Sequence, residues 1–301
     1  MTRLTTITFL ILWALNSFSQ EFGTHWICHP TPNDSSEVLF VHTYATTQIP
    51  QQAQISFASS GQVKVFVNER NIAPDITFNN ADTSSITLQT YDVTRYLNSS
   101  SNTIAVWYAP VTGTNISKQL SLEFYGINQD GSLFYHKADK KWICQALKGC
   151  YKRGTDETYD ARSYNHNWKE SDSYKKKWLH PLGAYNDSKQ FSISDEAWAF
   201  QNTQLQNIIK PVRLYQDSIG VHYDFGREFT GSIRLTLRDA RQGETLDIDG
   251  FTYICNGELD EQVFRRFTSA KQRVFTIRGD HLFKPSQIMN IEALEYNTFS
   301  N

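Results

Sequence analysis

The sequence predicts an all-β protein with two β-sandwich or jelly-roll modules in tandem. Apolar residues alternate with polar ones over short stretches rich in β-branched and aromatic side chains, which is typical of strands with one face on a core. Turn-forming residues separate these stretches at short intervals. Aromatic residues make up 14% of the chain, and long runs with helical periodicity are few. These observations favour short strands joined by polar turns.

The first group of predicted strands begins at Val38 and matches the spacing of a sandwich or jelly roll. Pro50 and Gly61 lie in the turns between its early members. The expected strands are 38–44, 53–58, 62–67, 85–88, 103–108 and 120–125.

A second group follows a polar, linker-like stretch at 184–194, and glycines punctuate it. We place the module boundary near residue 188, which gives modules at 21–188 and 189–301. One helical candidate, 195–207, has Ser194 as a potential N-cap but breaks up into Gln and Asn, so helix and loop both stay open. The expected strands are 208–214, 221–225, 232–237, 245–248 and 273–277.

Residues 1–20 have the pattern of a secretory signal peptide. Arg3 precedes a short apolar stretch, and small or polar residues follow it. The apolar stretch is too short for a permanent membrane span. We therefore expect export to the periplasm, the cell surface or the medium, with a mature chain that begins near Glu21. A buried N-terminal helix is the alternative.

Charge and cysteine content narrow the classes further. The chain has 29 Lys and Arg against 31 Asp and Glu, so no strong field selects nucleic acid or an acidic membrane. Cys144 and Cys150 are close enough in sequence for a small disulfide loop, and their pairing stays open. For Cys28 and Cys255 two interpretations stay open: they form a second disulfide bridge, or they are small apolar residues buried in the core. None of these spacings matches a zinc site.

Several short sequence motifs, in the same order along the chain, resemble the amino-terminal region of bacterial α-L-rhamnosidases. The match covers nearly the whole mature chain, and Glu69 stands where that family usually has Gly. The first module contributes 65–69 (VFVNE), 91–97 (YDVTRYL), 102–106 (NTIAV), 139–142 (DKKW) and 157–162 (ETYDAR), followed by Trp168 and Trp178. The second module contributes 223–226 (YDFG), Gly231, 234–235 (RL), 243–246 (GETL), 256–260 (NGELD) and 283–285 (FKP).

The resemblance implies a jelly-roll domain followed by a concanavalin-like β-sandwich domain. In the family these modules precede an (α/α)6 barrel that holds the catalytic carboxylates, and this chain ends at Asn301, where that barrel would begin. Glycoside hydrolysis needs two carboxyl groups on a rigid scaffold. We therefore expect no catalytic residues in this chain. No nucleophile elbow, phosphate-binding loop or HExxH motif is present in the sequence.

The predicted ligand-facing residues lie within one stretch of a dozen. A sugar offers hydroxyls to carboxylates, amides and guanidinium groups, and an apolar face to an aromatic ring. In the alternative interpretation the acidic residue and the arginine pair to hold a loop, and the tryptophan fills core. The predicted site is Glu157, Asp160, Arg162, Asn165 and Trp168.

The resemblance also makes calcium a candidate cofactor. Some jelly-roll modules of this kind bind a terminal sugar with its help, through oxygen ligands. Asp160, Asn165 and Asn167 could supply such oxygens, but their spacing is not that of an EF-hand loop. We assign no metal ligands.

Three functions follow from these patterns. The first is an exported carbohydrate-binding or accessory protein for a plant cell-wall polysaccharide or oligosaccharide, with rhamnose as a candidate component. The second is a truncated or divergent rhamnosidase-type hydrolase. The third is a structural partner of a separate glycoside hydrolase barrel.

Overall fold

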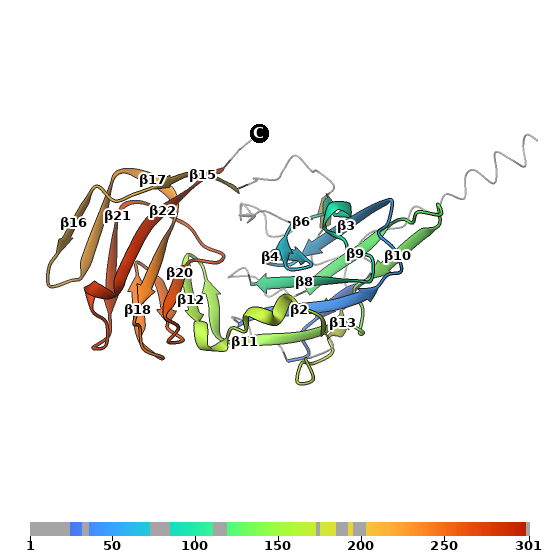
Figure 1. The fold of residues 1–301 in the computed structure, drawn as a ribbon, viewed down its shortest axis with the longest axis horizontal. Helices are drawn as coiled ribbons and strands as arrows, with labels where there is room; N and C mark the ends of the chain where they lie inside the picture. The colour runs from blue at the N-terminus through green and yellow to red at the C-terminus, as the bar shows by residue number, and fades with distance from the viewer. Residues whose placement is uncertain are drawn as a thin grey trace, which may run out of the picture.

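Figure 1 shows the computed structural model, which describes residues 25–31, 36–72, 85–110, 119–172, 175–184, 192–194 and 203–298. The fold is all-β, as predicted, and its described helical segments are short 3-10 turns. No described helix is long and apolar enough to cross a membrane. The predicted signal peptide, residues 1–20, and the predicted boundary near 188 lie outside the described residues.

The first module packs two antiparallel layers face to face. Phe40 and Val106 of one layer and Phe57 and Phe124 of the other belong to one buried apolar cluster. The first layer consists of β13 (Leu182–Ala184), β1 (Trp26–Cys28), β9 (Gln119–Ile127), β3 (Gln52–Ser59) and β7 (Gln89–Asp92), with β10 (Leu133–Lys137) on β9. The second layer consists of β11 (Ile143–Arg153), β2 (Ser36–Ala45), β8 (Ser101–Ala109), β4 (Gln62–Val67) and β5 (Arg70–Asn71).

The second module is organised by one 18-residue strand, β17 (Val221–Arg238). A register shift between Asp224 and Phe229 divides it. Its first part pairs with β16 (Arg213–Gln216), and its last part pairs with β20 (Asp260–Phe264) and β22 (Ile288–Thr298). Strand β21 (Ala270–Gly279) pairs with β17 on both sides of the shift. The remaining strands are β15 (Thr203–Ile209), β18 (Thr245–Ile248) and β19 (Phe251–Ile254).

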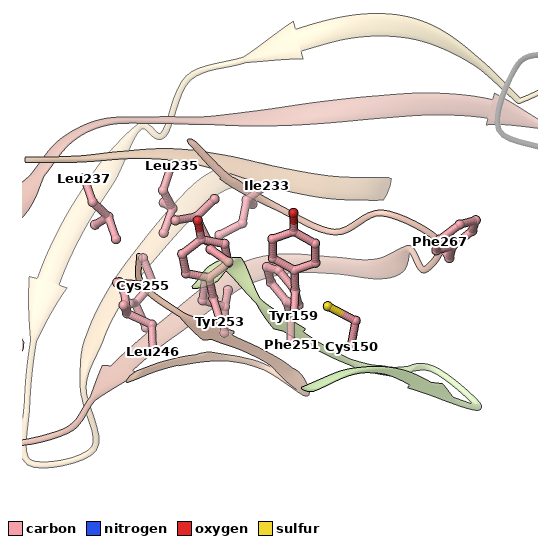
Figure 2. Close-up of a cluster of buried hydrophobic side chains, with 14 of the residues drawn as sticks. Cys150, Tyr159, Ile233, Leu235, Leu237, Leu246, Phe251, Tyr253, Cys255 and Phe267 are labelled. Carbon is pink, nitrogen blue, oxygen red and sulfur yellow. The ribbon is translucent and has the colours of Figure 1, made fainter. Parts of the chain in front are cut away.

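Figure 2 shows the core of this module between its strands. Ile233, Leu235 and Leu237 of β17 face Leu246 of β18 and Tyr253 of β19. All five side chains are buried. In β17 and β18 the period-two placement is the pattern from which strands 232–237 and 245–248 were predicted, because alternate side chains of a strand point to the same face. Strand β19 was not predicted.

Strand β12 (Asp156–Asp160) joins the two modules. It pairs antiparallel with β11, and in parallel with β19 over the register Glu157 to Phe251 through Asp160 to Ile254. A single path of paired strands therefore runs from one module into the other. Figure 1 shows β12 and β11 at the point where the two lobes meet.

Each predicted strand overlaps an observed strand, with corrections in both modules. The stretch 208–214 contains the end of β15 and the start of β16. Pro211 lies between these two strands, where it cannot continue the pairing because it has no backbone N–H to donate. The stretches 221–225 and 232–237 are two parts of β17. The observed strands that were not predicted are β1, β5, β7, β10, β11, β12, β13, β14, β19, β20 and β22. The alternation in β11 is broken by a register shift between Ala146 and Tyr151.

The helical candidate 195–207 is wrong where it can be checked. Residues 195–202 lie outside the described residues, and 203–207 belong to strand β15. Pairing with β22 supplies these residues with the backbone hydrogen bonds that a helix would otherwise provide. Within the linker-like stretch, residues 192–194 form β14 (Ser192–Ser194), which pairs in parallel with β6 (Ser85–Thr87).

All four cysteines are free thiols. Cys144 lies in the apolar cluster of the first module, whereas Cys150 lies in the cluster that β17 and its neighbours form. The irregular part of β11 between them turns the two side chains toward different cores. The pairing that the sequence left open is therefore not formed.

Candidate functional site

Two short 3-10 turns follow β12 and carry most of the predicted site. The first, η2 (Ala161–Ser163), begins after Asp160, whose Oδ1 accepts a hydrogen bond from the Arg162 backbone N–H at 3.0 Å. The second, η3 (His166–Lys169), begins after Asn165, whose Oδ1 accepts one from the Asn167 N–H at 3.0 Å. Asp and Asn cap such turns because their short side chains reach the backbone N–H groups left free at the start.

Asp160 and Arg162 form a bidentate ion pair. Arg162 donates from Nε to Oδ1 at 2.9 Å and from Nη2 to Oδ2 at 2.8 Å. These hydrogen bonds hold the pKa of Asp160 below its usual value. Gly149, with φ of 76°, lets β11 pass close by, since a Cβ there would lie 2.7 Å from the Asp160 Cβ. The pair holds the η2 turn against β11.

The carboxylate of Glu157 is fully engaged inside the protein. Its side chain is 1% exposed. Oε2 accepts hydrogen bonds from the backbone N–H groups of Phe267 at 3.0 Å and Thr268 at 2.9 Å, and from the Thr268 hydroxyl at 2.8 Å. Oε1 accepts from the Arg266 N–H. Glu157 therefore fixes the 266–268 segment onto β12.

Trp168 packs into the core while part of it borders a pocket. The residue is 1% exposed, and its Nε1 donates to the Tyr164 hydroxyl at 3.0 Å. Its ring meets those of Phe66 and Trp107 edge to face, with centroids 5.4 and 6.0 Å apart. Aromatic rings prefer this geometry in a packed core. Little of the indole face is left for a ligand.

The pocket has a volume of about 390 Å³ and lies between η3, β11 and the segment that follows η3. Its polar lining combines amide, hydroxyl and charged side chains with two indoles. The amides are Gln145, Asn165 and Asn167, the hydroxyls Ser163 and Ser171, the charged groups Glu170 and Lys175, and the indoles Trp168 and Trp178. Leu39 and Leu147 complete the lining.

Asp172 fixes the segment after η3 to β2. Its Oδ2 accepts a hydrogen bond from the Thr43 backbone N–H at 3.1 Å and lies 3.2 Å from His42 Nδ1. The Asp172 N–H donates to the Thr43 hydroxyl at 3.1 Å. These contacts hold one wall of the pocket in place.

The structure thus separates the five predicted residues into two groups. Asn165 and Trp168 line the pocket, whereas Glu157, Asp160 and Arg162 are not among its lining residues and form internal bonds. Sequence reasoning missed Gln145, Lys175 and, as a ligand-facing residue, Trp178. Trp178 was part of the family resemblance. Gln145 gave no signal, because an exposed residue on an irregular strand looks like any other polar residue.

No group of three or more His, Cys, Asp or Glu side chains suited to a metal occurs in the described part of the chain. Two of the three side chains named for calcium, Asp160 and Asn165, already have partners within the protein. Both carboxylate oxygens of Asp160 accept from Arg162, and the Asn165 Oδ1 accepts from Asn167.

Comparison with known proteins shows what this fold is similar to. No family model and no curated protein matches the sequence. The α-L-rhamnosidase from Dictyoglumus thermophilum superposes with a TM-score of 0.79 and 16% identity over 93% of this chain and 36% of its own. The α-L-rhamnosidase from Aspergillus terreus superposes with a TM-score of 0.75 and 15% identity over 92% of this chain and 36% of its own.

The α-L-rhamnosidase from Streptomyces avermitilis, solved with L-rhamnose, gives a TM-score of 0.73 and 17% identity over 89% of this chain and 29% of its own. This chain therefore spans about a third of the length of these enzymes. At such identities the similarity establishes a shared fold. It agrees with the fold that the sequence resemblance implied.

Proposed function

We propose that the protein is an exported carbohydrate-binding or accessory protein for plant-type glycans. The observation that carries the proposal is the pocket beside η3. The Trp178 indole offers apolar surface to a sugar ring, and the amide and hydroxyl groups of the lining match sugar hydroxyls. Rhamnose-containing glycans are the first candidates, because the shared fold is that of part of the rhamnosidases. Export rests on the pattern of residues 1–20.

A non-catalytic role agrees with the chemistry of the pocket. Glycoside hydrolysis generally requires two carboxyl groups on either side of the scissile bond. Among the described lining residues, Glu170 is the single carboxylate. The pocket therefore has groups that suit recognition of a sugar more than cleavage of its glycosidic bond.

Binding and turnover should be measured on one sample. Calorimetry of the mature protein with L-rhamnose and rhamnose-containing pectins, with and without calcium, tests recognition, and release of p-nitrophenol from the rhamnoside tests hydrolysis. We expect saturable binding, which Gln145→Ala weakens and Gln216→Ala, an exposed control on β16, does not. Turnover would support the truncated-hydrolase alternative instead. Absence of both binding and turnover would contradict the proposal.

A second candidate function is a structural partner of a separate catalytic barrel. Exposed apolar side chains on β15, β16 and their connection favour it, because exposed patches of this kind often mark protein contacts. Leu205 and Ile208 are each 53% exposed, Val212 is 71% exposed and Leu214 is 61% exposed. Stable co-purification with a rhamnosidase barrel, lost on Val212→Asp, would support this role. Absence of any complex would count against it.

A further inference from the structure

Lys175 places an ammonium group in the wall of the pocket. Its Nζ donates to the backbone carbonyl oxygens of Ser171 at 2.8 Å and Glu170 at 2.5 Å. The same Nζ lies 5.6 Å from the centroid of the Trp178 ring. Within the described part of the chain, no carboxylate forms an ion pair with it.

An ammonium group has three N–H donors, and two of those on Lys175 go to carbonyl groups. One donor and a formal positive charge therefore remain for a ligand. Burial lowers the pKa of Lys175 below its ordinary value, and the attraction of Asp172 and Glu170 offsets part of this effect. The charge is thus incompletely compensated by the protein itself.

The surrounding segment adds to this positive character. Residues 169–177 contain four lysines against two acidic residues. One of these acids, Asp172, directs its carboxylate to β2, where the Thr43 N–H and His42 hold it. The other, Glu170, lines the pocket but is exposed to solvent, so water and salt screen its charge. Lys169 lies over the Phe66 ring, with Nζ 4.9 Å from its centroid. The pocket lining itself holds one acidic and one basic side chain, and the excess of positive charge comes from the segment around it.

We propose that the pocket selects an acidic sugar, a uronic acid residue within an oligosaccharide, whose carboxylate pairs with Lys175. This inference rests on the proposed function and specifies its ligand class. An ammonium–carboxylate hydrogen bond is charge-assisted and stronger than a neutral one. Trp178, beside the ammonium, supplies an apolar surface for the ring. The amides Gln145, Asn165 and Asn167 suit the hydroxyls of the same or the adjoining sugar.

The test compares two ligands that differ in one group. These are a galacturonic acid–rhamnose disaccharide and the same disaccharide with its carboxyl reduced to an alcohol, both titrated by calorimetry into the mature protein. We expect the acidic form to bind at least tenfold more tightly at low salt, with the ratio falling as salt rises. Lys175→Met retains the aliphatic stem beside Trp178 and should bring the ratio close to one. Lys177→Gln removes an equal charge outside the pocket lining and should leave the ratio above fivefold.

The outcomes separate this inference from the proposed function. Equal affinity for the two disaccharides, or a preference that persists in Lys175→Met, would overturn the assignment of an acidic sugar while sugar binding itself stands. Failure of the unsubstituted protein to bind either disaccharide or rhamnose would overturn both. Thermal melts of each variant establish that it is folded, and a second variant, Lys175→Gln, should lose the preference in the same way.

Discussion

At the scale of single residues, the β4–β5 hairpin contains backbone strain at Glu69. Asn68 and Glu69 have φ of 46° and 68°, in the left-handed region. Asn68 tolerates this conformation and donates from Nδ2 to the Tyr96 carbonyl at 2.7 Å. We expect Glu69→Gly to raise the free energy of unfolding by about 1 kcal/mol, because glycine carries no Cβ penalty there. Urea denaturation measures this. Arg70→Gly, in the adjoining strand, should destabilise the protein instead, and stabilisation by both would contradict the explanation.

Glu37 is the residue from which we expect a pH dependence. It is 0% exposed, and its Oε2 accepts a hydrogen bond from Trp107 Nε1 at 2.7 Å. Burial, with repulsion from Glu157, raises its pKa from 4.5 to about 8. The folded protein thus holds a proton that the unfolded chain releases. The contribution of this proton to the free energy of unfolding is fully present below pH 4.5 and is lost as the pH rises toward 8. The slope is at most about 1.4 kcal/mol per pH unit.

Glu37→Gln should flatten this dependence, because glutamine does not ionise. Melting temperatures between about pH 5 and 9 measure it, and Glu258→Gln, an exposed control, should follow the unsubstituted protein. Parallel pH profiles for Glu37→Gln and the unsubstituted protein would show that Glu37 does not titrate as described.

At the scale of elements, the η3 turn depends on Trp168 as its core anchor. The side chain packs against Phe66 and Trp107, so Trp168→Ala should leave a cavity and lower the free energy of unfolding by about 3–5 kcal/mol. Trp178→Ala, at a partly exposed position, should cost less. Thermal and urea denaturation of both variants measure the difference. A loss of unfolding free energy for Trp168→Ala that is no larger than the loss for Trp178→Ala would contradict the role of Trp168 as a core anchor. If Trp168→Ala is strongly destabilised, its loss of sugar binding reports a disturbed η3 turn and not a direct contact with the sugar.

At the scale of the whole molecule, β12 makes the second module dependent on residues before 188. It pairs with β19, it contributes the buried Tyr159 to the shared core, and Glu157 holds the 266–268 segment. We expect a fragment of residues 189–301 to lack a cooperative unfolding transition, and a fragment of residues 154–301 to regain one. Circular dichroism during urea titration distinguishes them. A cooperative transition in 189–301 alone would support an independent module with the boundary predicted near 188.

The predicted site shows where sequence reasoning stopped. The stretch 157–168 was recognised because carboxylate, guanidinium, amide and indole groups occur together in it. Their roles depend on partners far along the chain. Glu157 meets Thr268, and Trp168 meets Phe66 and Trp107, which no local spacing indicates. Lys175 and Gln145 became candidates through the pocket alone.

By itself the sequence determined the all-β class and the approximate position of many strands, because alternation of side chains is a local property of an extended backbone. The tertiary structure decided how β12 connects the two modules, that Cys144 and Cys150 remain free, and which polar side chains face a pocket. These features depend on contacts between residues that are distant in sequence. Pairing and packing in three dimensions set such contacts, and a one-dimensional pattern does not contain them.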